Sequence, residues 1–215
     1  GSQGVFRRWN WWNGAWMVML VLLIGSSLIY TVLGTRVRVG DRFNPGPATL
    51  DGTAYMEQAV HRERDQSFGL KADREAIRWL QDNVAGSPVV LEAHDEQYHW
   101  SARISIYTGL PTVLGWPWHQ MQQRWDYQGE IRERASRIRE MYETTDPRRA
   151  ETLLRQYDVK YIMVGELERI YYSHPGLLKF SRMADAGFLE PVFRSEEVVI
   201  YETKWMTEAA QGPAQ

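Results

Sequence analysis

A long apolar segment near the N-terminus limits how this chain can fold. No charged residue occurs between Arg8 and Arg36, and residues 15–34 read AWMVMLVLLIGSSLIYTVLG. An α-helix of that length is about 30 Å long, which is the thickness of the hydrocarbon layer of a bilayer. Lipid offers the backbone no hydrogen-bond partner, so a spanning segment of this kind must be helical. The sequence therefore predicts a transmembrane helix over residues 15–34, preceded by a membrane-flanking segment over residues 1–14.

The residues around the apolar segment favour a retained membrane anchor. Tryptophans, whose indole rings sit well at a membrane interface, gather at its start: Trp9, Trp11, Trp12 and Trp16. The alternatives are a buried core helix and a cleaved signal peptide, whose apolar part is usually shorter, at about 7–15 residues. Arginines flank both ends of the segment, so charge does not decide which side of the membrane the rest of the chain occupies.

The charge and the cysteine content exclude several classes of protein. The 215 residues include 25 Lys and Arg and 27 Asp and Glu, which gives a net charge of −2. Nucleic-acid-binding proteins need a basic surface, so no nucleic-acid partner is expected. The chain has no cysteine, which excludes disulfides, thiolate metal sites and a cysteine nucleophile. Because the first 40 residues are basic and the remainder is acidic, the composition indicates a membrane anchor joined to a globular domain.

Alternating helix and strand patterns predict an α/β domain over residues 50–205. Residues 35–49 are rich in glycine and proline and predict a linker, and residues 206–215 predict a flexible tail. Apolar residues at helical spacing predict helices over residues 73–84, 101–107, 130–142 and from Asp146 onward. Short apolar runs predict strands over residues 89–91, 111–114 and 159–164, followed by a hairpin of residues 189–194 and 197–202. This order predicts three layers, with helices on both faces of a mostly parallel sheet and the C-terminal hairpin at its edge.

Polar and aromatic residues follow the ends of the predicted strands. Ligands of open α/β sheets bind beyond the carboxyl ends of the strands, so we expect these residues to meet along one rim. Carboxylates, arginines and aromatic rings together suit a sugar or another polyol. The candidate ligand-binding residues are Glu92, His94, Arg103, Trp116, Trp118, His119, Arg124, Glu166 and Arg169.

Several candidates also have a purely structural interpretation. Glu92 at the end of a strand is more often a salt-bridge partner than a functional acid. Trp116 and Trp118 flank a proline and can pack their loop onto the core. Arg169 can pair with Glu166 across one helical turn.

The sequence predicts neither a metal site nor a catalytic residue. His94 and His99 are five residues apart, which suits neither one helix face nor one strand face. The sequence has no glycine-rich phosphate loop, no HExxH and no GxSxG motif, and no cofactor is predicted. Whether the protein is part of an enzyme is left open by these observations.

Three blocks of sequence resemble the YYY-domain family of multi-spanning membrane proteins of unknown function. The blocks are LDGTAYM from Leu50, RISIYTGLPTVLGWPWHQ from Arg103 and YDVKYIMVGELERIYY from Tyr157. Members of this family are similar to glycosyltransferases of the GT-C class, which use lipid-linked sugar donors. The resemblance implies that this chain corresponds to the final transmembrane helix and the extracytoplasmic C-terminal domain of such a protein in the cell membrane. GT-C enzymes carry their catalytic acid between early membrane helices, so a chain with one span is either a fragment or a free-standing subunit.

The resemblance leads to two hypotheses about function. In the first, the chain is an accessory domain that binds an acceptor or a lipid-linked sugar. In the second, it is a non-catalytic single-span subunit that docks onto a larger membrane protein complex. Residues 125–127, WDY, also resemble part of the WWDYG acceptor-binding motif of oligosaccharyltransferases, although the glycine after the tyrosine is missing. The expected partners are the lipid bilayer, other membrane protein subunits and a glycan.

Overall fold

The structure is a computed structural model that describes residues 11–42, 49–95 and 98–205. The chain divides into two compact units, residues 1–50 and residues 51–215. The predicted tail, residues 206–215, and most of the predicted flanking segment lie outside the described residues.

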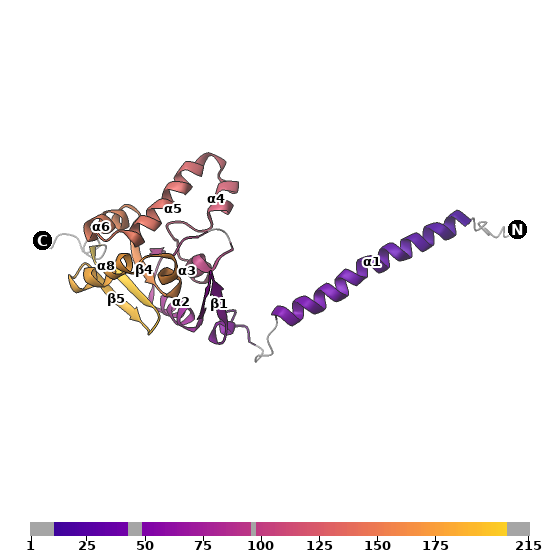
Figure 1. Ribbon diagram of the computed structural model, residues 1–215, viewed down its shortest axis with the longest axis horizontal. Helices are drawn as coiled ribbons and strands as arrows, with labels where there is room; N and C mark the ends of the chain where they lie inside the picture. Colours follow the sequence, from indigo (N-terminus) through magenta and orange to yellow (C-terminus); the bar gives the residue numbers. More distant parts are fainter. Residues whose placement is uncertain (1–10, 43–48, 96–97, 206–215) are drawn as a thin grey trace. The chain divides into compact units, whose positions relative to one another are not determined.

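The first unit contains one continuous helix, α1 (Trp11–Arg42) (Figure 1). A helix of 32 residues is about 48 Å long and therefore exceeds the hydrocarbon thickness of a bilayer. By length and composition, α1 is suited to crossing a membrane. It includes the predicted span, residues 15–34, and continues through Arg36 and Arg38 into the segment predicted as a linker.

The second unit contains a mixed four-stranded sheet with the strand order β3-β4-β6-β5. The strands are β3 (Val89–Leu91), β4 (Val159–Val164), β5 (Leu189–Arg194) and β6 (Val199–Thr203). The pair β3–β4 is parallel, whereas β4–β6 and β5–β6 are antiparallel. The structure thus confirms an α/β domain with the C-terminal hairpin at one edge of the sheet.

The sheet is less parallel than the sequence predicts. Residues 111–114, expected as a strand, form only an isolated parallel bridge between Thr112 and Val90. The Pro111 carbonyl accepts a hydrogen bond of 2.8 Å from the Val90 N–H. Because proline has no N–H to donate, the segment cannot extend this ladder at Pro111. The prediction of a mostly parallel sheet was therefore wrong in this respect.

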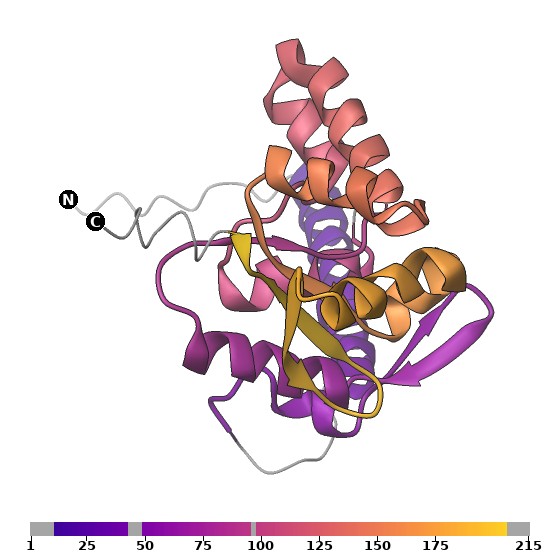
Figure 2. The ribbon, with the colours of Figure 1, turned by 90° about the vertical axis from the view of Figure 1, so that its left-hand side faces the viewer.

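Helices cover both faces of the sheet, which confirms the predicted layers (Figure 2). Alternate residues of β4 point to opposite faces, so Tyr161 and Met163 pack on one side while Ile162 and Val164 pack on the other. The first face is covered by α2 (Lys71–Asn83) and α3 (Arg103–Thr108). The second face is covered by α5 (Gln128–Glu143), α6 (Pro147–Gln156) and α8 (His174–Asp185).

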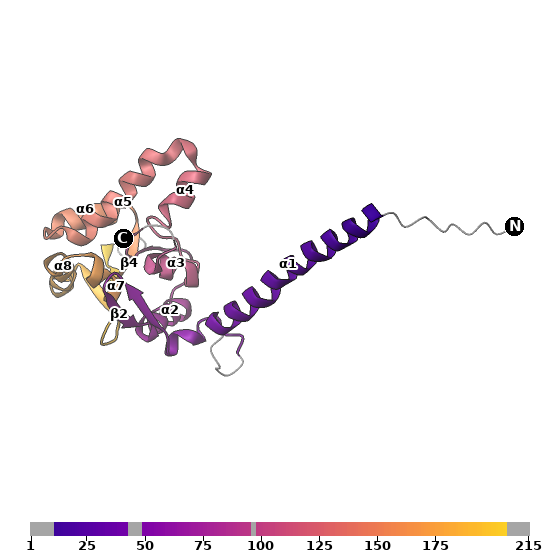
Figure 3. The ribbon, with the colours of Figure 1, turned by 45° about the vertical axis from the view of Figure 1, so that its right-hand side comes forward.

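A hairpin and a projecting helical segment lie outside the four-stranded sheet and the helices that cover it. A separate antiparallel hairpin consists of β1 (Val60–Glu63) and β2 (Gln66–Gly69). In Figures 1 and 3, α4 (Pro117–Gln123) and the first turns of α5 project away from the sheet. The remaining short elements are η1 (Ala54–Glu57), η2 (Trp100–Ala102), η3 (Trp125–Tyr127) and α7 (Glu166–Tyr171).

Candidate functional site

Arg103 is fully buried and is the centre of an ion-pair network. Its Nε lies 2.8 Å from Asp73 Oδ2 on α2, and its Nη2 lies 2.8 Å from Glu168 Oε2 on α7. Glu168 also accepts hydrogen bonds from the N–H groups of Ala93, at 2.9 Å, and Gly165, at 2.8 Å. One buried arginine therefore connects α2, α3 and the segments that follow β3 and β4.

Glu92 is buried next to this network. Its carboxylate accepts hydrogen bonds from the N–H groups of Ile104, at 2.7 Å, and Ser105, at 3.2 Å, in the first turn of α3. Burial raises the pKa of Glu92 to about 7, against the opposing effects of these hydrogen bonds and of Arg103. Glu92 and Arg103 were expected at a ligand-binding rim, but the structure places both in the interior. There Glu92 accepts hydrogen bonds from the first turn of α3, and Arg103 pairs with acidic residues of α2 and α7.

The segments after β3 and β4 meet, as the parallel pairing of these strands predicts. The His94 N–H donates a hydrogen bond of 3.0 Å to the Tyr172 hydroxyl. Burial lowers the pKa of the His94 imidazole. Glu166 and Arg169 lie on the exposed side of α7 and pair with each other at 2.6 Å. Arg169 also donates to the Glu197 carbonyl, so its guanidinium is held by this chain.

An aromatic group surrounds the start of α4. The rings of Trp116 and His119 lie 5.6 Å apart, and each lies 5.2 Å from the ring of Tyr98. Trp116 and His119 are half-buried, whereas 51% of Trp118 is exposed. The structure therefore brings Trp116 and His119 together and leaves Trp118 on the surface.

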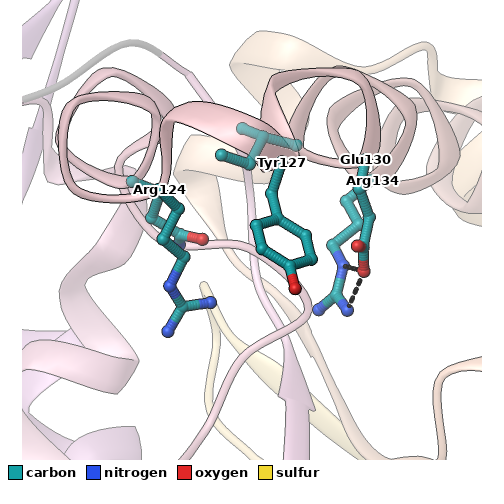
Figure 4. Close-up of a pocket in the computed structure, with 6 residues that line it drawn as sticks. Arg124, Tyr127, Glu130 and Arg134 are labelled. Carbon is teal, nitrogen blue, oxygen red and sulfur yellow. Dashed lines mark hydrogen bonds and ion pairs between the residues drawn. The ribbon is translucent and has the colours of Figure 1, made fainter.

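A groove of about 410 Å³ lies between α4 and α5. Its lining residues are Gln120, Arg124, Tyr127, Glu130, Ile131 and Arg134. Figure 4 shows the side chains of Arg124, Tyr127 and Arg134 extending to the same side of the two helices.

The two arginines of the groove are held differently. Arg134 donates twice to Glu130 Oε1, at 2.6 and 3.2 Å, across one turn of α5. Within residues 11–42, 49–95 and 98–205, no group accepts a hydrogen bond from the guanidinium of Arg124, and no carboxylate forms an ion pair with it. Arg124 therefore presents free donors at the surface.

Among the residues that line the groove, Arg124 is the one that was predicted to bind a ligand. Tyr127 belongs to the WDY segment, and the four-residue spacing of Glu130 and Arg134 indicates an ordinary solvated helix face. Their position in a groove depends on the packing of α4 against α5, which the sequence pattern does not contain.

Comparisons with known proteins include a distant structural likeness. No protein-family model matches the chain, and no curated protein sequence matches it. A solved structure is similar in part. It is the C-terminal globular domain of an oligosaccharyltransferase from Archaeoglobus fulgidus, at 11% sequence identity and a TM-score of 0.38. The matched region covers 61% of this chain and 96% of that domain. The resemblance to the YYY-domain family stays a prediction.

Proposed function

We propose that this protein is a membrane-anchored accessory domain that binds an anionic sugar ligand in the groove between α4 and α5. The observation that carries the proposal is the free guanidinium of Arg124 at the groove. A guanidinium offers paired donors that match the geometry of phosphate or carboxylate oxygens. The ligand classes are an acceptor glycan that carries an acidic group and a lipid-linked sugar phosphate.

The other groups of the groove suit the sugar part of such a ligand. Tyr127 offers a ring face for C–H groups and a hydroxyl for a hydrogen bond. Glu130 neutralises much of the charge of Arg134, and its carboxylate can also accept hydrogen bonds from sugar hydroxyls. The volume of about 410 Å³ lies within the range of about 300–1,000 Å³ typical of small-molecule sites.

Helix α1 supports the proposal that the domain is attached to a membrane. Its length and apolar composition suit a single span, and attachment would raise the local concentration of lipid-linked ligands around the groove. We place the domain on the extracytoplasmic side of the cell membrane, in line with the resemblance to the YYY-domain family.

A binding experiment with the full chain in detergent micelles tests this function. The probes are a short-chain polyprenyl diphosphate-linked N-acetylglucosamine and the free sugar. Their binding is measured by titration calorimetry. We expect Arg124→Ala to weaken binding of the diphosphate-linked sugar at least tenfold. Arg132→Ala removes an exposed arginine of the same helix region that does not line the groove, and should bind like the parent. Equal affinities of the two variants, or no binding by the parent, would contradict the proposal.

A second candidate function is docking onto a larger membrane protein complex. It is favoured by the exposure of Trp125, at 77%, and of Trp118 on the projecting α4 segment. Exposed tryptophans are enriched at protein interfaces. The test is native mass measurement after mild detergent extraction. A stoichiometric complex that dissociates with Trp118→Ser and Trp125→Ser would support docking, and a persistent monomer would rule it out.

A further inference from the structure

Three residues from separate segments, none of which lines the groove, form a group of metal-ligating side chains. Glu63 ends β1, Asp95 follows β3, and His99 immediately precedes η2. One carboxylate oxygen from each acid and one imidazole nitrogen all lie within 4.8 Å of one another. The five-residue spacing of His94 and His99 could not predict this arrangement, because the partners of His99 are Glu63 and Asp95.

Within the described part of the chain, no arginine or lysine forms an ion pair with the buried carboxylate of Glu63. Only 6% of Glu63 is exposed, and in the described part of the chain its ion-pair partners are two histidines. Its Oε2 lies 3.2 Å from His61 Nε2 and 3.5 Å from His99 Nδ1. The buried carboxylates Asp73 and Glu168, in contrast, both pair with Arg103. A buried carboxylate needs a compensating cation, and Glu63 lacks a permanent one in the described chain.

The basic residue next to Glu63 in the sequence is engaged with a different segment. Arg64, next to Glu63, donates to the Ile170 carbonyl at 3.1 Å and lies over the Tyr171 ring at 4.6 Å.

We propose that Glu63, Asp95 and His99 bind a divalent transition-metal ion, with Zn²⁺ the favoured one. Zn²⁺ binds imidazole nitrogen and carboxylate oxygen at about 2.0–2.2 Å, which separates the ligands of a tetrahedral site by about 3.4 Å. The 3.5 Å between Glu63 Oε2 and His99 Nδ1 fits this value, and the partly buried Asp95 and the exposed His99 can adjust to reach the ion. Imidazole favours Zn²⁺ over Mg²⁺ and Ca²⁺, which prefer oxygen ligands alone.

The neighbouring groups suit the surroundings of a metal site. His61 can donate to the Glu63 carboxylate and hold its orientation, as outer partners of metal ligands commonly do. Three protein ligands leave a fourth position for water or for a ligand. A bound ion would also fasten the β1–β2 hairpin to the segment after β3.

The experiment measures the metal content of the full chain in detergent. The purified protein is stripped with a chelator, dialysed against ZnCl₂, and analysed by mass spectrometry for zinc, with CoCl₂ as a spectroscopic substitute. We expect about one Zn²⁺ per chain and visible d–d absorption with Co²⁺. His99→Ala and Asp95→Asn should each weaken Zn²⁺ binding at least tenfold, whereas His174→Ala, which removes an exposed histidine on α8, should leave it unchanged.

Loss of Zn²⁺ binding in His99→Ala can be separated from loss of the fold. Because the side chain of His99 is 43% exposed, His99→Ala should retain the parent circular dichroism and melting temperature without metal. Zinc binding that is equal in His99→Ala and the parent would overturn the site, as would an absence of zinc above the detergent blank. Displacement of Zn²⁺ by equimolar Ca²⁺ would overturn the choice of metal. None of these outcomes depends on Arg124, so the groove is tested separately.

Discussion

Replacing Glu92 by glutamine should make the stability of this protein less dependent on pH. Burial raises the pKa of Glu92 from an ordinary value of 4.5 to about 7 in the folded state. The folded protein therefore holds this proton more tightly than the unfolded chain does. The resulting stability is present in full below about pH 4.5 and is lost as pH rises through about 7. At 1.36 kcal/mol per pKa unit, the gap from 4.5 to 7 corresponds to about 3 kcal/mol.

The assay is urea unfolding of the full chain in detergent at pH 5 and pH 8.5. Glutamine stays neutral and its amide oxygen can still accept from the Ile104 N–H. Relative to the parent, Glu92→Gln should therefore gain about 2 kcal/mol in unfolding free energy between the two pH values. Glu190→Gln changes a carboxylate whose side chain is 60% exposed, and should differ from the parent by less than about 0.5 kcal/mol at both. An unchanged difference for Glu92→Gln would refute the reasoning, because it would show that Arg103 keeps Glu92 ionised throughout.

Two other substitutions test the packing of the domain. Arg103→Leu should cost about 3–5 kcal/mol in unfolding free energy at pH 7, because it leaves Asp73 and Glu168 buried without their cation; a loss under about 1 kcal/mol by urea unfolding would contradict the network. Gly176→Ala should lower the unfolding free energy, measured by thermal melts, by about 1–3 kcal/mol or more, because a Cβ there would collide with the Tyr142 carbonyl. The control is Gly129→Ala, whose Cβ would meet no atom within 4 Å. In the same melts, Gly129→Ala should be neutral or stabilising by up to about 1 kcal/mol.

Several local elements of this fold were predictable from the sequence. The strand predicted at residues 159–164 is β4, and the helix predicted at residues 130–142 lies within α5. The strand follows from a short apolar run, and the helix follows from apolar residues at helical spacing. The hairpin β1–β2 was missed, because VHRE and QSFG have no clear apolar alternation. Missing β1 also hid Glu63 and the group that it forms with Asp95 and His99.

The candidate site was predictable only in part, because sequence shows residue types but not which distant side chains oppose them. Arg103 lies 30 positions from Asp73 and 65 positions from Glu168, and no local spacing indicates these pairs. Arg124 was selected for following a predicted strand, yet its free guanidinium is a consequence of how α4 packs against α5. The simple pairing of Arg169 with Glu166, in contrast, is a property of one helical turn and is confirmed.

The two proposed sites depend on the buried network around Arg103 to different degrees. Glu168 binds the Ala93 N–H, two residues before Asp95, so the Arg103 network sets the position of one proposed metal ligand. The groove is built from residues 120–134 of α4 and α5 and has no bond to that network among the described residues. Under conditions where Arg103→Leu remains folded, it should therefore weaken Zn²⁺ binding while leaving the affinity for the diphosphate-linked sugar within about twofold of the parent. Equal loss at both sites, measured by the same dialysis and calorimetry, would mean that α4 and α5 depend on the sheet edge for their arrangement.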